Sequence, residues 1–356
     1  MLIFALMINA TYKPYTLQFK QASGTSRGVL KTKDTWFMIL RENGRFGIGE
    51  CGMFRGLSID DRPDFETKLE WTCSNIHLGL EKLRDELTEF PSIQFGLEIA
   101  FKSLSSRDSF ELFPSAFTQK QAPIDINGLI WMGTKDFMKQ QIKDKLKTGF
   151  RCIKMKIGAI DFDTELELLK FIRHEFTIHD IELRVDANGA FLPSEALHRL
   201  QRLSEFDLHS IEQPIKQGQW AEMAKLCKET PLPIALDEEL IGLFSESKKQ
   251  ELLKIINPQY IILKPTLIGG FKGSKEWIDL AARQQIGWWV TSALESNIGL
   301  NAIAQWTYTL KNKLPQGLGT GSLYTNNFDS SLVVKNGTLR YENEHPWDLS
   351  QLDIKI

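Results

Sequence analysis

The feature that most constrains the fold is a regular alternation of short apolar runs and amphipathic stretches from residue 124 onward. Eight runs have the length and composition of buried strands, and they cover residues 124–131, 152–157, 183–187, 208–212, 234–238, 260–263, 288–294 and 317–320. Predicted helices lie between them, among others at residues 135–146, 164–176, 194–203, 220–228 and 274–284. Eight parallel strands, each followed by a crossover helix, close into a barrel. The alternation therefore predicts an α/β fold of the (β/α)8 type.

The chain before this alternation has a different character. Strand-like runs at residues 15–19 and 35–40 and an Asn43-Gly44 turn signal predict an antiparallel sheet. Helical periodicity follows within residues 58–107. The expected organisation is an α+β capping domain at residues 1–120, a barrel at residues 121–325 and a C-terminal segment at residues 326–356 that returns to the cap.

Composition restricts the kind of partner. Lys and Arg total 43 against 45 for Asp and Glu, so the chain has no broad positive field for nucleic acid or anionic lipid. No stretch approaches the ~20 apolar residues of a membrane span. The four cysteines are scattered, which excludes a zinc motif or disulfide framework and favours the cytoplasm. We expect a small anionic substrate as the partner; the sequence does not indicate an oligomeric state.

Charged residues stand where six consecutive strands of the predicted barrel end. They are Lys154 and Lys156, Asp186, Glu212, Asp237, Lys264 and Glu295. A single such residue is more often a salt-bridged loop residue, but buried charges are costly unless they are paired or bind a metal. The carboxyl ends of barrel strands form the active-site face. Repetition on six strands therefore predicts one polar site.

Three of these residues suggest a metal. Asp186, Glu212 and Asp237 come from neighbouring strands and offer only oxygen ligands, which suits Mg²⁺ and does not suit zinc.

The lysines suggest acid–base chemistry. Lys156 and Lys264 belong to strands that are four positions apart in an eight-stranded barrel, so they face each other across its mouth. A lysine beside a second lysine and a divalent cation is expected to have a lowered pKa, which makes it a usable general base. Abstraction of a proton α to a carboxylate is the predicted chemistry, because the metal's charge stabilises the resulting enolate or enediolate. None of the six histidines ends a strand at this rim.

These residues also form a recognisable set of motifs. They are Lys154-Met-Lys156, Asp186-Ala-Asn188, Glu212-Gln-Pro214, Asp237-Glu238, Lys264-Pro265 and Glu295-Ser296. The set resembles the enolase superfamily, within it the muconate-lactonising subgroup, and within that the o-succinylbenzoate synthase family. The use of a Lys base with Mg²⁺ is a known property of this superfamily.

The resemblance implies a role for each position. Asp186, Glu212 and Asp237 would bind Mg²⁺, with Mn²⁺ as a substitute, Lys156 would remove the α-proton, and Lys264 would stabilise the enediolate. The implied reaction is the syn-dehydration of 2-succinyl-6-hydroxy-2,4-cyclohexadiene-1-carboxylate to o-succinylbenzoate in menaquinone biosynthesis. Residues implied to contact substrate or support the site are Lys154, Arg184, Asn188, Glu238, Ser292, Glu295, Gly319, Thr320 and Arg27, the last in a segment at residues 23–28 that resembles a closing loop.

Two alternatives remain open within the same fold. The same lysines can transfer a proton without dehydration, as in an N-acylamino-acid racemase or a dipeptide epimerase. Dipeptide epimerases have an Asp-x-Asp on the eighth strand, whereas this chain has Gly317-Leu-Gly319-Thr-Gly321 there, which disfavours a substrate amine. The non-catalytic alternative is a barrel that binds a metal and a dicarboxylate, although binding alone does not require a base on each side.

Overall fold

The first part of the chain forms an antiparallel sheet with helices against it. The computed structural model describes residues 8–25 and 28–352. The sheet order is β1-β2-β3, with bounds Asn9–Thr25, Gly28–Glu42 and Arg45–Cys51. The helices are α1 (Phe65–Ser74), η1 (Ile76–Leu78), α2 (Gly79–Glu86), α3 (Pro91–Ser105) and α4 (Ala116–Lys120). The predicted hairpin is confirmed, because β2 and β3 pair from Glu42↔Arg45 onward around the Asn43-Gly44 turn.

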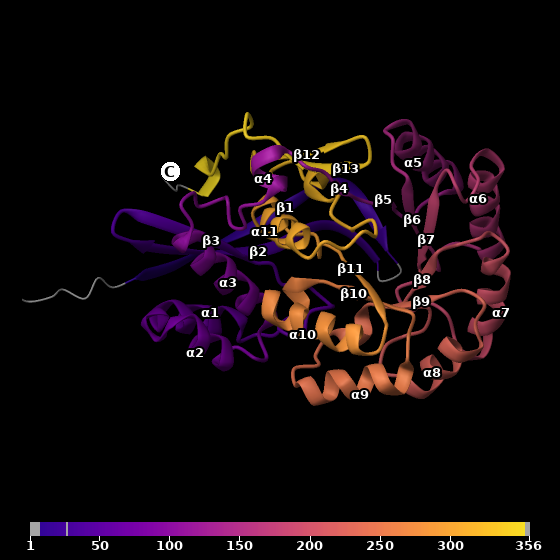
Figure 1. The fold of residues 1–356 in the computed structure, drawn as a ribbon, viewed down its shortest axis with the longest axis horizontal. Coiled ribbons are helices and arrows are strands. Elements are labelled where there is room, and N and C mark those ends of the chain that lie inside the picture. Colours follow the sequence, from indigo (N-terminus) through magenta and orange to yellow (C-terminus); the bar gives the residue numbers. More distant parts are fainter. Residues whose placement is uncertain (1–7, 26–27, 353–356) are drawn as a thin grey trace, which may run out of the picture.

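The second part forms a curved parallel sheet surrounded by helices (Figure 1). Its order is β11-β10-β9-β8-β7-β6-β5, so strands adjacent in the chain are adjacent in space. The strands are β5 (Gly128–Ile130), β6 (Cys152–Lys156), β7 (Glu182–Asp186), β8 (Ser210–Glu212), β9 (Ile234–Leu236), β10 (Tyr260–Leu263) and β11 (Gly287–Val290). This arrangement confirms the predicted α/β barrel class.

Helices connect the successive strands, as the alternation predicted. They are α5 (Lys135–Lys147), α6 (Phe162–Glu175), α7 (Pro193–Ser204), α8 (Trp220–Glu229), α9 (Glu246–Ile256), α10 (Gly270–Arg283) and α11 (Asn297–Thr309). Single 3₁₀ turns follow two strands, at η2 (Glu238–Leu240) and η3 (Pro265–Leu267). Others are η4 (Gly321–Leu323) and η5 (Ser350–Leu352).

The eighth expected strand differs from the prediction. Residues 317–320 form no extended strand; instead Gln316 bridges to Ile126 and Gly317 bridges to Thr291, both in parallel fashion. The approach is close, since a Cβ added to Gly317 would lie 1.8 Å from Thr291 Oγ1. These two bridges link both ends of the parallel sheet. They close the barrel with a glycine-rich segment in place of a regular strand.

The first expected strand is also interrupted. Residues 124–131 divide into β4 (Ile124–Asp125) and β5, and β4 leaves the barrel to pair with β13 (Thr338–Tyr341). β12 (Leu332–Lys335) completes that small sheet.

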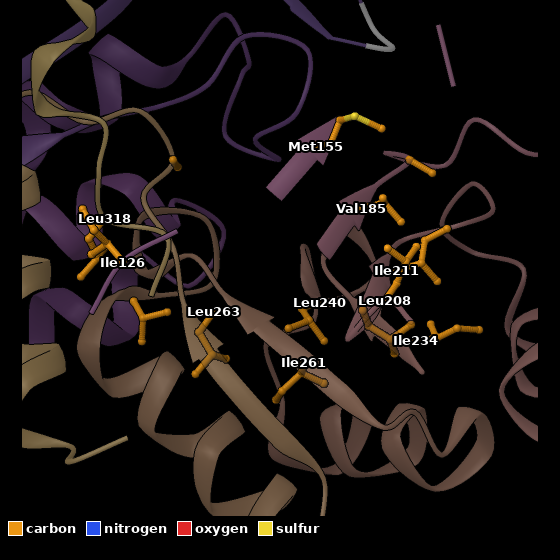
Figure 2. Packing of buried hydrophobic residues seen from close by; sticks show 14 of the residues in the cluster. Ile126, Met155, Val185, Leu208, Ile211, Ile234, Leu240, Ile261, Leu263 and Leu318 are labelled. Atoms are coloured by element: carbon orange, nitrogen blue, oxygen red, sulfur yellow. The ribbon is translucent and has the colours of Figure 1, made fainter. Parts of the chain in front are cut away.

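The barrel core lies between the sheet and its helices. Met155, Val185 and Ile211 are buried and alternate with the charged residues of their strands, so they face the opposite side of the sheet. Figure 2 shows these side chains following one another along the curved sheet, with Ile234 and Ile261 continuing the series. Because the apolar residues take the helix-facing side, the charged residues are left to point into the barrel.

The C-terminal segment contacts both parts of the chain. Phe328 and Leu349 pack in one buried cluster with Phe37 and Ile48 of the cap. The β12–β13 hairpin instead pairs beside the start of the barrel. The division at residues 120 and 325 stays a prediction. In the part of the chain that the structure describes, no helix is long and apolar enough to cross a membrane.

Candidate active site

A cavity lies at the carboxyl ends of the barrel strands. The cap covers it with Leu30, Phe54 and Leu57. Its lining includes eight of the residues expected from the sequence, namely Lys154, Lys156, Asp186, Asn188, Lys264, Ser292, Gly319 and Thr320. The sequence pattern and the topology therefore agree on one polar site beneath an apolar cover.

Two lysines of β6 bind carboxylates of the neighbouring strands. Lys154 Nζ lies 2.7 Å from Glu212 Oε2 and 3.2 Å from Asp186 Oδ2. Lys156 Nζ donates to Asp186 Oδ2 at 2.7 Å and to Asn188 Oδ1 at 2.7 Å. The two lysines share the side of β6 that faces the barrel interior, because they are two residues apart in a strand. Each buried cation is thus paired, as its desolvation requires.

Lys264 occupies the other side of the cavity. It follows β10, and three strands, β7, β8 and β9, separate it from β6. Its ammonium donates to Asp237 Oδ2 and lies 4.0 Å from Glu212 Oε1. The expectation that Lys156 and Lys264 flank the carboxylates agrees with this order of strands.

The carboxylates respond in opposite ways to this environment. Burial raises the pKa of Glu212 well above its usual range, and the neighbouring Asp186 adds to the rise. Burial also opposes ionisation of Asp186, but Lys156 and Lys154 outweigh it and hold the pKa of Asp186 well below its usual range. Lys264 lowers the pKa of Asp237 against the effect of burial in the same way.

The expected lowering of a lysine pKa is wrong for Lys154 and Lys264. Burial favours a lower pKa for Lys154, yet the Glu212 and Asp186 carboxylates raise it. Burial likewise favours a lower pKa for Lys264, but the Asp237 and Glu212 carboxylates raise it. The prediction rested on a second lysine and a divalent cation beside the lysine, whereas in the protein alone the neighbouring carboxylates dominate.

The three carboxylates have the chemistry of a hard-metal site. Among the described residues, no three His, Cys, Asp or Glu side chains are arranged to hold a metal ion. Lysine ammonium groups bind all three carboxylates instead. However, Glu212 Oε1 is buried and accepts no hydrogen bond from a described residue. An unsatisfied buried oxygen beside two further carboxylates fits a divalent cation that takes oxygen ligands. The residues therefore fit Mg²⁺.

A hydrogen-bonded chain forms the wall after β11. Glu295 is fully buried and accepts from Ser292 Oγ at 2.6 Å and from Thr266 Oγ1. Ser292 Oγ accepts in turn from Thr320 Oγ1 at 2.9 Å and from the backbone N–H of Leu294 at 2.9 Å. Leu294 has a φ of +64°, which is unusual for a branched residue and is stabilised by these contacts. Glu295 thus holds the wall without lining the cavity.

Four other expected residues lie outside the cavity lining: the expected metal ligands Glu212 and Asp237, whose carboxylates pair with the lining residues Lys154 and Lys264, and also Arg184 and Glu238. Arg184 is buried one layer below Asp186 in β7, where its guanidinium pairs with Glu182 at 2.6 Å and stacks over Trp289 at 4.2 Å from the ring centre. Glu238 accepts from Asn188 Nδ2 at 3.0 Å. These positions support the lining residues rather than reach the cavity. Arg27 lies outside the described residues.

Sequence reasoning missed a buried carboxylate that joins the cap to the barrel. Glu50 of β3 is fully buried and accepts from Thr35 Oγ1 at 3.0 Å, from Ser296 N at 2.9 Å and Oγ at 2.6 Å, and from Gly299 N at 2.9 Å. It therefore satisfies the start of α11, where unpaired N–H groups favour an anion. Residues 50 and 296 are distant in sequence, so no local pattern connects them. Asn127 and Lys145, which also line the cavity, were missed too.

Comparison with known proteins places this geometry in a family. A family model described as enolase C-terminal domain-like matches residues 138–345, more than half of the chain. The chain belongs to the enolase superfamily. This confirms the resemblance drawn from the strand-end motifs.

Individual members of the superfamily are similar over nearly the whole chain. An o-succinylbenzoate synthase of Desulfotalea psychrophila is 48% identical, covering 92% of this chain and 98% of its own. A crystal structure of MenC from Desulfotalea psychrophila LSv54 superposes with a TM-score of 0.83 at 44% identity, over 94% of this chain and 99% of that one. An L-Ala-D/L-Glu epimerase of Bacillus subtilis is 26% identical, covering 92% of this chain and 89% of its own. This chain is thus far more similar in sequence to the synthase than to the epimerase.

Proposed function

We propose that this chain is an o-succinylbenzoate synthase, a hydro-lyase that converts 2-succinyl-6-hydroxy-2,4-cyclohexadiene-1-carboxylate to o-succinylbenzoate in menaquinone biosynthesis. One observation carries the proposal: Lys156 and Lys264 line one cavity from opposite sides of a carboxylate cluster. The 48% identity to a synthase over most of both chains selects this reaction among those of the superfamily. The four cysteines are free, which favours the cytoplasm as its compartment.

The reaction begins with removal of the α-proton. The neutral amine of Lys156 takes the proton from the carbon beside the ring carboxylate, and the C–H electrons move into that carboxylate. Lys156 is held by Asp186 and Asn188, each at 2.7 Å, so its position is fixed relative to the cavity. Lys264 lies on the opposite side, where its positive charge stabilises the enediolate.

The second step uses the same lysine. The Lys156 ammonium returns its proton to the β-hydroxyl, the C–O bond breaks, and water leaves as the ring becomes aromatic. Because one lysine removes the proton and assists the leaving group, both depart from the same face of the ring. The atoms balance as the loss of one water, and the lysine ends as it began.

We assign Asp186, Glu212 and Asp237 to hold Mg²⁺. When bound, the ion supplies positive charge next to the developing negative charge on the substrate carboxylate. The support is the set of three buried carboxylates and the unsatisfied Glu212 Oε1. Asn188 and Glu238 form a hydrogen-bonded pair beside Lys156 and keep its amine aimed at the substrate.

The eighth-strand segment favours this reaction over dipeptide epimerisation. Residues 317–321 contain no carboxylate that could receive a substrate amine. The substrate of an N-acylamino-acid racemase has an acylated nitrogen and no ammonium group, so it needs no carboxylate on the eighth strand. Racemisation of such a substrate is therefore the competing reaction for the same lysines.

Two substrates distinguish these reactions. Purified protein with Mg²⁺ should convert the cyclohexadiene to o-succinylbenzoate, and EDTA should abolish the conversion. α-Deuterium exchange of an N-succinylamino acid, followed by NMR in D₂O, measures the racemase reaction in the same sample. A higher kcat/KM for exchange than for dehydration would reverse the assignment, and full activity in EDTA would contradict the metal site.

A further inference from the structure

The active-site cavity has a second cationic end that the reaction described above does not use. Lys145, near the end of α5, lines the cavity together with Lys154, Lys156 and Lys264. The one acidic residue among the lining residues that the structure describes is Asp186, which is paired with two of these lysines. Glu212 and Asp237 do not line the cavity but pair with Lys154 and Lys264, so the surplus positive charge of the lining is that of Lys145. Such a cavity suits a substrate with more than one negative charge.

A glycine lets Lys145 reach the cavity from outside the barrel. A Cβ added to Gly128 of β5 would lie 3.1 Å from Lys145 Cδ, so the lysine stem packs closely over the bare strand. The ammonium lies 5.0 Å from the centre of the Phe150 ring. Burial lowers the pKa of Lys145, and Asp144 opposes the effect only in part. No carboxylate of a described residue lies within ion-pair distance of this ammonium. It is thus partly desolvated and has no fixed counter-ion.

A second polar group stands at the same end. Asn127 is 5% exposed, and its Oδ1 has no hydrogen-bond partner among the described residues. Asn127, Leu129 and Trp131 alternate along the chain and all line the cavity, so their side chains share the inner face. The two amide atoms of an asparagine are assigned by their bonding partners, so this end of the side chain can present an N–H donor to an anion.

The glycine-rich segment that replaces the eighth strand completes this end. Gly319 and Ser322 line the cavity and also an outer groove that Lys145 shares with them. A Cβ on Gly319 would lie 3.6 Å from the Asn127 carbonyl oxygen, which places the segment directly beside β5. Lys145, Asn127 and Gly319 therefore meet at the seam between the first strand of the barrel and its closing segment.

We propose that this seam binds the second carboxylate of the substrate, with the Lys145 ammonium as its counter-ion and Asn127 as a hydrogen-bond donor. The inference rests on the proposed function, since it assigns the succinyl arm of the cyclohexadiene to this end while the ring carboxylate lies at Lys156 and Lys264. Lys145 is a specificity-determining residue in this arrangement. It takes no part in proton transfer.

The test compares two ligands that differ only in the distal carboxylate. They are o-succinylbenzoate and 2-butanoylbenzoate, in which a methyl group replaces that carboxylate. Calorimetric titration in Mg²⁺ should show that Lys145→Met weakens o-succinylbenzoate binding by about tenfold or more, the loss expected for a charge-assisted hydrogen bond. Binding of 2-butanoylbenzoate should stay unchanged. Lys145→Arg should retain most of the affinity.

Lys143→Met is the matched control, because Lys143 is an exposed lysine of the same helix. It should leave both affinities unchanged. Equal weakening of both ligands by Lys145→Met, or no weakening of o-succinylbenzoate, would overturn the inference. Turnover of the cyclohexadiene by the wild type is measured alongside. If the wild type converts the cyclohexadiene but Lys145→Met binds both ligands normally, the carboxylate site at the seam is refuted and the proposed function stands. If the wild type does not convert the cyclohexadiene, the proposed function itself fails.

Discussion

Replacing Glu50 with glutamine should weaken the joint between cap and barrel. Each carboxylate oxygen of Glu50 accepts two hydrogen bonds: Oε1 from Thr35 Oγ1 and Ser296 N, and Oε2 from Ser296 Oγ and Gly299 N. A glutamine amide has only one acceptor oxygen, so in either orientation its NH₂ group faces one backbone N–H, that of Ser296 or that of Gly299, which then has no acceptor. The Thr35 or Ser296 hydroxyl on the same side can turn and accept from the NH₂ group. The side chain is fully buried, and water cannot compensate.

The size of the effect follows from these contacts. A hydrogen bond to a charged group contributes about 1.5–3 kcal/mol, so losing the one bond to a backbone N–H in Glu50→Gln should cost about 1.5–3 kcal/mol. An unfolding entropy of about 2.1 cal/mol/K per residue gives about 1.3 °C per kcal/mol for a chain of 356 residues. We therefore expect the melting temperature to fall by about 2–4 °C.

Differential scanning calorimetry measures this shift directly. Glu86→Gln is the matched control, because Glu86 is exposed on α2, and its melting temperature should equal that of the wild type. If Glu50→Gln melts within 1 °C of the wild type, the four hydrogen bonds do not hold the joint and the reasoning is refuted.

Two further predictions concern pH and metal. Burial raises the pKa of Glu165 to about 7, so the folded protein binds the carboxyl proton more tightly than the unfolded chain does. The stabilisation from this proton is complete below the ordinary carboxyl pKa and is lost as the pH rises to about 7. The unfolding free energy of wild type relative to Glu165→Gln should therefore fall between about pH 4.5 and pH 7, and urea titrations showing a flat difference would contradict this. Mg²⁺ at about 100 times its Kd should stabilise the wild type by about 2.7 kcal/mol in a thermal melt, and Glu212→Gln should reduce that gain; an unchanged gain would remove Glu212 from the metal site.

Much of the barrel and its chemistry could be predicted because the relevant signals repeat. Lys156, Asp186, Glu212 and Lys264 each stand at or just after the end of a strand, and the parallel topology brings such positions to one face. No single residue carries that inference.

The eighth strand could not be predicted correctly from local pattern. The bridges of Gln316 and Gly317 depend on a close backbone approach to Ile126 and Thr291, which only the closed barrel provides. Glycine gives no side-chain periodicity from which such an approach can be inferred.

Glu50 and Lys145 could not be found for a related reason. A glutamate in a strand and a lysine near a helix end are both patterns typical of solvent-exposed residues. Glu50 is buried against the start of α11, and the stem of Lys145 packs closely over Gly128 on its way to the cavity. Both depend on contacts between distant parts of the chain.

The most direct measurement of the central claim is the activity of Lys156→Ala. The structure places the Lys156 amine in the cavity, held by Asp186 and Asn188, and the proposed dehydration uses it in both proton transfers. Wild type should convert the cyclohexadiene to o-succinylbenzoate, and Lys156→Ala should lose at least about 10²–10⁴-fold in kcat, while calorimetry still shows o-succinylbenzoate binding. A folded, ligand-binding Lys156→Ala variant with kcat near that of the wild type would contradict the assignment of Lys156 as the base.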